Sequence, residues 1–237
     1  MLNSVGLQNP GVDAFVEKEL PWLKTKGTKI IANLSGNTLE EYAALAEKLS
    51  APGVDMLEVN ISCPNVKHGG LAFGTLPESA AAATKAVKSH THLPVMVKLS
   101  PNVTDITEIA RAVEAEGADA VSLINTLLGM RIDLSTRRPI LRNNTGGLSG
   151  PAVLPVAVRC VHQVYRAVKI PILGMGGVSS GEDAAELMMA GAAAVGVGTA
   201  TISDPAAPMR ILEELTAFCA AHNIGDVASL TGTLEVW

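Results

Sequence analysis

Six short apolar segments recur along the chain, and each is rich in residues that favour β-strands. They are TKIIANLSG, VDMLEVNIS, LPVMVKLSP, ADAVSLINT, KIPILGMGG and AAAVGVGTA. Stretches with helical spacing separate them, and alternating strands and helices with short joints indicate parallel strands with helical crossovers. Three joints, PGVDMLEV, EGADAVSL and AGAAAVGV, carry a Gly where a helix ends in a left-handed turn before a buried strand. The repeat therefore predicts an α/β fold.

The spacing of apolar residues predicts where the helices lie. One helix is expected over roughly residues 12–24, before the first strand. The others are expected in LEEYAALAEKLSA, LPESAAAATKAVKSH, VTDITEIARAVEAEG, PAVLPVAVRCVHQVYRAVK, SGEDAAELMMAG and DPAAPMRILEELTAFCAAHN. In the fourth of these stretches we predict one apolar face, made of Leu154, Val158, Val161, Tyr165 and Val168.

Two architectures fit this repeat, an open doubly wound sheet and a (β/α)8 barrel. The late pair GMGG and GVGTA favours the barrel, because barrels often bind phosphate at two consecutive late strand ends. The first of the pair also fails the dinucleotide-binding pattern, whose third glycine is replaced by Ser179. We predict a (β/α)8 TIM barrel that lacks its first two strands, formed as a single domain over residues 1–237.

Composition excludes several classes of partner. The net charge is −5 and no block of five or more basic residues occurs, so no nucleic acid is expected. The longest uncharged stretch, 187–202, is too short and too rich in Gly and Ala to span a membrane. Three widely spaced cysteines give neither a disulfide framework nor a metal site. We therefore predict a cytoplasmic protein with no bound metal and no membrane association.

Polar residues end the predicted strands, where a barrel has its active site. Three strands end in Asn33, Asn60 and Asn125, and one ends in Lys98. The asparagines either cap turns or bind a ligand whose edge alternates N–H and C=O groups, such as a pyrimidine dione or a flavin ring. Lys98 either pairs with a structural carboxylate or stabilises an anionic cofactor. We favour ligand binding in both cases.

Cys63 follows a predicted strand end, on a loop that carries Gly69, Gly70 and Gly74 as possible hinges. It is either a buried, inert thiol or a reactive one on a lid that closes over substrate. Its place beside Lys67 and His68 favours a nucleophile or general base. Cys160 and Cys219 lie in amphipathic helices, and we predict that both only pack.

The motifs NISCPN, VKLSPN, INTLLGMR, TGGLSGPA, GMGG and GVGTA, in this order, resemble class 1 dihydroorotate dehydrogenases. The resemblance is closest to the NAD-linked type B catalytic subunit and runs to about residue 215. It implies an FMN-dependent (β/α)8 barrel that oxidises dihydroorotate to orotate in the biosynthesis of UMP. The related dihydropyrimidine dehydrogenase-type reductase is the alternative activity, and an inactive partial barrel is the non-enzymatic one.

The resemblance also implies roles for individual residues. Cys63 is the expected base that takes a proton from C5 of dihydroorotate while a hydride leaves C6. The expected substrate-binding residues are Asn3, Ser4, Val5, Gly6, Leu7, Asn60, Asn125 and Thr126. The expected FMN-binding residues are Asn33, Asn60, Lys98, Ile124, Gly150, Gly176, Gly177, Gly198 and Thr199.

Partners follow from the resemblance as well. Type B enzymes pair with an iron–sulfur, FAD-containing subunit that passes electrons to NAD, and a homodimer within a heterotetramer is expected. Fumarate, the acceptor of type A relatives, stays open as an alternative. Family members begin with two further strands, and Met1 resembles an internal position of theirs. We therefore expect the polypeptide alone to bind flavin poorly and to turn over slowly.

Overall fold

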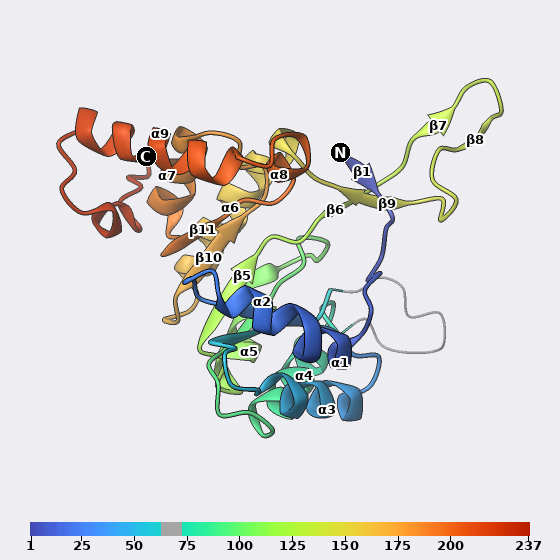
Figure 1. Ribbon diagram of the computed structural model, residues 1–237. Helices are drawn as coiled ribbons and strands as arrows, with labels where there is room; N and C mark the ends of the chain where they lie inside the picture. Colours follow the sequence, from blue (N-terminus) through green and yellow to red (C-terminus); the bar gives the residue numbers. More distant parts are fainter. Residues whose placement is uncertain (63–72) are drawn as a thin grey trace. The chain divides into compact units, whose positions relative to one another are not determined.

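The structure, a computed structural model, describes residues 1–62 and 73–237 (Figure 1). The chain forms two compact units. Unit one comprises residues 1–5, 100–106 and 122–237, and unit two comprises residues 6–99 and 107–121. Whether the two units act as the single domain expected from the sequence stays a prediction.

All six predicted strands are present in one parallel sheet. They are β2 (Ile31–Leu34), β3 (Met56–Asn60), β4 (Val95–Lys98), β5 (Ala120–Leu123), β10 (Ile172–Met175) and β11 (Ala194–Gly196). Among the described residues the strand order is β11-β10-β5-β4-β3-β2, which is sequential along the chain. Sequential parallel order is what the repeat of strands and helices predicted, and β5 is divided between the two units.

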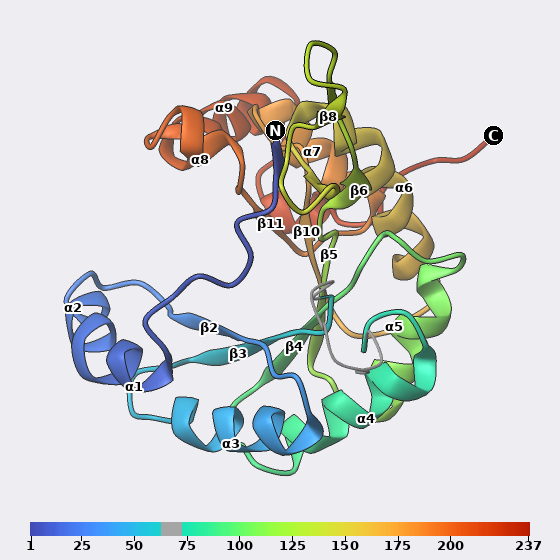
Figure 2. The same ribbon diagram turned by 90° about the vertical axis from the view of Figure 1, so that its right-hand side faces the viewer.

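Unit two is built on β2, β3 and β4, whose strands pair in parallel register (Figure 2). Its helices are α3 (Leu39–Leu49), α4 (Pro77–Lys88) and most of α5 (Ile106–Ala115). The predicted first helix forms as α1 (Val12–Ala14), a π-helical turn (Phe15–Glu19) and α2 (Leu20–Lys24). Figure 2 shows α3 and α4 along one face of the strands, where Ala32, Leu34, Leu57, Val59, Val95 and Val97 are buried.

Two of the three similar joints use an aspartate to fix the neighbouring strand. Asp55 accepts a hydrogen bond from the N–H of Ile30, and Asp119 accepts one from the N–H of Val95. The third joint has Ala193 at the same place and keeps only the backbone bond, from its N–H to the carbonyl of Ile172. The glycine of each joint has a positive φ, as predicted.

Unit one contains β10 and β11 with α6 (Leu154–Tyr165), α7 (Gly181–Ala190), α8 (Ala200–Ser203) and α9 (Ala207–Ala221). Helix α7 contacts both α6 and α9. A 3-10 turn (Pro151–Val153) precedes α6, and another (Val227–Leu230) follows α9 and packs on it through Leu230, Cys219, Met188 and Ala185.

Of the apolar face predicted for α6, Val161 is buried, Leu154, Val158 and Val168 are half-buried, and Tyr165 is exposed. The helix buries Ala157, Cys160, Val161 and Val164, whereas Tyr165 is 42% exposed. Ala157 and Cys160, which are small, occupy buried positions of the helix. The prediction did not include them because it was based on the larger apolar side chains. Cys160 and Cys219 are buried, so the prediction that both pack is confirmed. Burial raises the pKa of the Cys160 thiol, which keeps it protonated and unreactive.

Two small antiparallel sheets in unit one were not predicted from the sequence. Strand β9 (Gly146–Leu148) lies between β1 (Leu2–Asn3) and β6 (Leu127–Gly129). The segment between β6 and β9 carries the hairpin of β7 (Ile132–Asp133) and β8 (Arg138–Pro139), which projects from these strands in Figure 1. Large apolar side chains are exposed along it: Leu128, Met130, Ile132, Leu134 and Ile140.

No helix in the described part of the chain is both long and apolar enough to cross a membrane.

Candidate active site

The sheet of unit two has one apolar face and one face on which polar side chains accompany Ile31, Met56 and Met96, which we call the polar face. Side chains alternate along a strand, and partners in register share a face. Asn33 pairs with Glu58, and Asn60 pairs with Lys98. These four polar residues therefore lie on the face opposite α3 and α4, toward the carboxyl ends of β2, β3 and β4. Three of the four were predicted site residues.

The carboxylate of Glu58 fixes the side chain of Asn33. Nδ2 of Asn33 donates to Oε2 of Glu58 at 2.5 Å. Glu58 is only 8% exposed, so this hydrogen bond to a charged group is shielded from water. Because the amide nitrogen points at a carboxylate, Oδ1 of Asn33 is the atom left to meet a ligand, and it accepts hydrogen bonds.

The side chain of Asn60 is held through its oxygen, whereas that of Asn33 is held through its nitrogen. Oδ1 of Asn60 accepts from the N–H of Ser62 at 3.1 Å, and its own carbonyl accepts from the hydroxyl of buried Tyr42 on α3 at 2.9 Å. Nδ2 of Asn60 is therefore oriented as the donor. The two asparagines of this face present opposite hydrogen-bonding groups, as recognition of a ring with alternating N–H and C=O groups requires.

Lys98 ends β4 with a half-buried side chain. In the part of the chain that the structure describes, none of the ion pairs includes Lys98. The alternative role for Lys98, a structural ion pair with a carboxylate, is therefore not supported by these residues. An ammonium group in a partly buried position favours an anionic ligand.

Cys63, Lys67 and His68 lie outside the described residues, so the predicted base has no structural description. Its neighbours in sequence are placed, however. Oγ of Ser62 donates to the carbonyl of Lys98 at 3.2 Å, and the backbone of Gly74 lies against the carbonyl of Ile61. Both flanks of the 63–72 segment are thus anchored at the carboxyl ends of β3 and β4.

Leu7 and Asn33 line a common cavity of about 320 Å³ in unit two. Residues from the first helical segment, including Val12 and Phe15, complete its walls together with Ile31 of β2. Gly6 precedes this cavity, is exposed, and has a positive φ. The structure thus brings one predicted substrate-binding residue next to one predicted cofactor-binding residue.

In unit one, the antiparallel strands bring Asn3 and Thr126 to the same glycine. Nδ2 of Asn3 donates to the carbonyl of Gly147 at 3.4 Å, and a Cβ at Gly147 would overlap the side chain of Thr126. Oδ1 of Asn125 accepts from the N–H of Thr126 at 2.8 Å, which leaves Nδ2 of Asn125 as a donor. Ser4 is half-buried and Val5 is 69% exposed.

Asn102 holds the Asn125–Thr126 loop. Its Nδ2 donates to the carbonyl of Thr126 at 2.9 Å, and its Oδ1 accepts from the N–H of Leu128 at 2.9 Å. The side-chain amide of Asn102 thus provides the hydrogen bonds to this loop that a neighbouring backbone would otherwise make. Sequence reasoning missed Asn102, although it stands in the motif VKLSPN.

The glycine loops of unit one follow β10 and β11. Gly176 and Gly177 have φ values of 121° and 90°, and Gly176 lies against Ile124. The N–H of Ile124 donates to the carbonyl of Met175 at 2.8 Å, so Ile124 and Gly176 are neighbours. No backbone hydrogen bond occupies the N–H groups of Gly176, Gly177 and Gly198 within the described residues. Such groups are available to an anion.

Gly150 and Thr199 also meet. A Cβ at Gly150 would lie 3.7 Å from Cγ2 of Thr199, and Oγ1 of Thr199 donates to Oγ of Ser149 at 2.8 Å. Ser149 in turn accepts at its carbonyl from the amino group of Met1 at 2.6 Å. Ser149 and Glu58 were not predicted. The only sequence signal for Glu58 is an acidic residue within an apolar run, two positions before Asn60.

The chain matches the family model described as "Dihydroorotate dehydrogenase" over residues 1–219. It is 60% identical over 237 residues to the "Dihydroorotate dehydrogenase B (NAD(+)), catalytic subunit" of Geobacter sulfurreducens, and equally to that of Geobacter metallireducens. Each match covers 100% of this chain and 78% of the relative. The same subunit of Bacillus pumilus is 56% identical over 98% of this chain and 75% of its own length.

Among solved structures, the chain resembles DHODH from Eimeria tenella, whose crystal structure is a complex with ferulenol. The TM-score is 0.80 at 23% identity, over 98% of this chain and 70% of that one. At this identity the likeness establishes the fold alone. Together with the six sequential parallel strands, it confirms the predicted partial (β/α)8 TIM barrel.

Proposed function

Because the chain belongs to the dihydroorotate dehydrogenase family, we propose that it oxidises dihydroorotate to orotate in pyrimidine biosynthesis, with FMN as its cofactor. The observation that carries the proposal is the polar face of unit two. Asn33, Asn60 and Lys98 end three adjacent parallel strands, and the two asparagines are held in opposite hydrogen-bonding orientations. This arrangement suits a ring with alternating N–H and C=O groups and an anionic form.

The residues of the glycine loops fit the phosphate of FMN. A Cβ at Gly177 would lie 2.7 Å from the backbone nitrogen of Leu154, so packing alone explains that glycine. Gly198 is different, because a Cβ there would meet nothing within 4 Å and its φ is not positive. Neither packing nor backbone conformation requires glycine at this position. Close approach of a ligand to its backbone is the reason we favour.

Each residue then has a role. Gly176, Gly177, Gly198 and Thr199 hold the phosphate, with Gly150 beside Thr199, and Ile124 packs against the flavin. Asn33 and Lys98 bind the flavin ring, and Asn60 contacts both flavin and substrate. Asn125, Thr126 and the segment from Asn3 to Leu7 bind the substrate.

The reaction removes one proton and one hydride from dihydroorotate. We assign the proton at C5 to the sulfur of Cys63, which needs thiolate character for this step. Bound FMN supplies the two-electron acceptor for the hydride that leaves C6. Lys98 stabilises negative charge on the cofactor side.

The relatives' name, a catalytic subunit of the B (NAD(+)) type, implies a separate partner subunit. We propose that this partner carries an iron–sulfur centre and FAD and passes electrons to NAD, within a heterotetramer built on a homodimer. Two of the three cysteines are buried among packing residues, which supports assigning such a centre to the partner. The exposed apolar side chains of the β6–β9 segment offer a surface for subunit contact. A cytoplasmic location stays a prediction.

The test is anaerobic titration of the FMN-loaded protein with dihydroorotate. Loss of the flavin absorbance at about one equivalent supports the proposal, and dihydrouracil provides the matched substrate control. A folded, FMN-loaded sample that keeps its absorbance with dihydroorotate contradicts it. Bleaching by dihydrouracil alone would instead assign the chain to pyrimidine-base reduction.

A further inference from the structure

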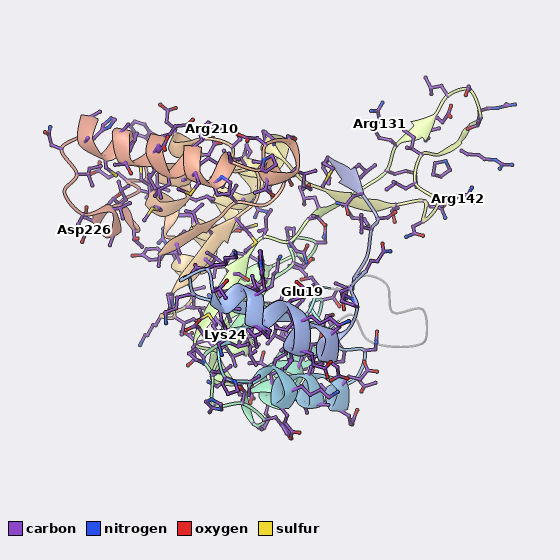
Figure 3. The ribbon with its side chains drawn as sticks, in the orientation of Figure 1. Glu19, Lys24, Arg131, Arg142, Arg210 and Asp226 are labelled. Carbon is purple, nitrogen blue, oxygen red and sulfur yellow. The ribbon has the colours of Figure 1, made fainter. Side chains whose placement is uncertain are left out.

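Arg210 on α9, which Figure 3 labels, contacts the two segments of unit one that follow β10 and β11. Its Nη2 donates to the carbonyl of Ser179 at 3.3 Å, in the loop that begins at Gly176. Its Nε lies 3.5 Å from Oδ2 of Asp204, which ends the segment that begins at Gly198. One side chain therefore joins the loop after β10 to the segment after β11.

Three carboxylates surround this bridge and are already engaged. Oδ2 of Asp183 accepts from the N–H groups of Ser179 and Ser180 and from the hydroxyl of Ser179. Oε2 of Glu214 accepts from the N–H of Gly181 at 2.8 Å, while Oε1 accepts from Nη1 of Arg210 at 2.6 Å. The carboxylate of Glu214 thus occupies the N–H of Gly181 and the hydroxyl of Ser180 occupies that of Asp183, so these two N–H groups of α7 are not available to a phosphate.

This arrangement has an electrostatic consequence for an anionic ligand. Asp183 and Asp204 stand six residues after Gly177 and Gly198, and Glu214 accepts from the N–H of Gly181. In the described part of the chain Arg210 is the cation that pairs with Asp204 and Glu214. Arg210 holds the pKa of Glu214 below its usual value, so this carboxylate is charged at neutral pH. Without Arg210, Asp204 and Glu214 would each lose the cation that they pair with beside these loops.

We propose that Arg210 is a positioning residue for the FMN phosphate. It joins the loop after β10 to the segment after β11 and pairs with Asp204 and Glu214, so that the site prefers FMN to riboflavin, which lacks the phosphate. The inference rests on the proposed function, because it takes these loops as the phosphate site. The competing explanation is an ordinary surface ion pair between neighbouring turns of α9, which would act on stability alone.

The experiment compares Arg210→Met, Arg210→Lys and the control Arg159→Met. Arg159 makes a similar contact along a helix of the same unit, with Oε1 of Gln163 at 2.7 Å, and its side-chain hydrogen bonds among the described residues stay within α6. Flavin-free protein is titrated with FMN and with riboflavin, at low and high salt, and flavin fluorescence gives both dissociation constants. Circular dichroism checks that each variant is folded.

We expect Arg210→Met to weaken FMN binding by about 5-fold to 10-fold and riboflavin binding by less than about 2-fold. High salt should recover part of the loss, because it screens the carboxylates. Arg210→Lys should retain part of the preference, and Arg159→Met all of it. If Arg210→Met weakens binding of both flavins equally, or weakens neither, the role of Arg210 is overturned. The proposed cofactor is still supported in that case, provided that the wild type binds FMN. A wild type that binds neither flavin overturns the proposed cofactor and this role with it.

Discussion

Replacing Gly177 with Ala tests how the first glycine loop is built. Its φ is 90°, a conformation that L-residues rarely adopt. The new Cβ would lie 2.7 Å from the backbone nitrogen of Leu154 and 2.9 Å from its Cα. Both atoms belong to the backbone at the start of α6, so no rotamer change relieves the overlap. The loop or the helix must move.

The expected loss of stability has two parts. A positive φ at a non-glycine residue costs about 1–2 kcal/mol, and overpacking against rigid atoms costs about 1–3 kcal/mol. Together they predict a loss of about 2–5 kcal/mol, a large fraction of the roughly 5–15 kcal/mol that stabilises a typical domain. Gly198→Ala is the matched control, because its Cβ meets nothing within 4 Å. Its stability should change by less than about 0.5 kcal/mol.

The assay is urea unfolding of flavin-free protein, followed by circular dichroism. Gly177→Ala should move the midpoint strongly to lower urea, and Gly198→Ala should leave it unchanged. FMN titrations should show the effect of the other variant. Gly198→Ala should weaken FMN binding without any loss of stability, because its methyl group occupies the space proposed for the phosphate. If Gly177→Ala unfolds with the wild type, the packing of this loop against α6 is not as described.

Three further predictions concern stability and catalysis. Although burial favours the neutral acid, hydrogen bonds from Lys88 and from the N–H of Val95 lower the pKa of Asp119 in the folded protein. The stability that this carboxylate contributes is therefore present above the ordinary value of 3.8 and is lost as the pH falls below it. Asp119→Asn should flatten the acid end of a curve of unfolding free energy against pH, and an unchanged curve would argue against these hydrogen bonds. Leu57 is 0% exposed and Leu134 is 88% exposed, so chemical denaturation should show a loss of about 2–5 kcal/mol for Leu57→Ala and almost none for Leu134→Ala; equal losses would contradict the burial. Cys63→Ser should slow flavin bleaching by dihydroorotate at neutral pH by at least about 100-fold, measured by stopped flow, with Cys219→Ser as the thiol control; bleaching at the wild-type rate would exclude Cys63 as the base.

The sequence by itself determined the order of strands and helices. Strand and helix periodicity are local properties, and the glycines of the three joints mark helix ends by their own backbone preference. The aspartates Asp55 and Asp119 repeat in two of these joints, but their partners, Ile30 and Val95, lie 25 and 24 residues away and are known only from the structure. The strand-end positions of Asn33, Asn60 and Lys98 followed directly, because the carboxyl end of a parallel strand is known once the strand is known.

Only the tertiary structure decided what these residues touch. The partner of Asn33 is 25 residues away, that of Thr199 is 50 residues away, and Arg210 reaches a carbonyl 31 residues before it. No local pattern encodes such pairs. The antiparallel strands β1, β6 and β9 were missed for the same reason, since two or three residues carry no periodicity and their pairing is entirely non-local. Register and packing, rather than residue type, turned Glu58 and Arg210 from ordinary charged residues into parts of the candidate site.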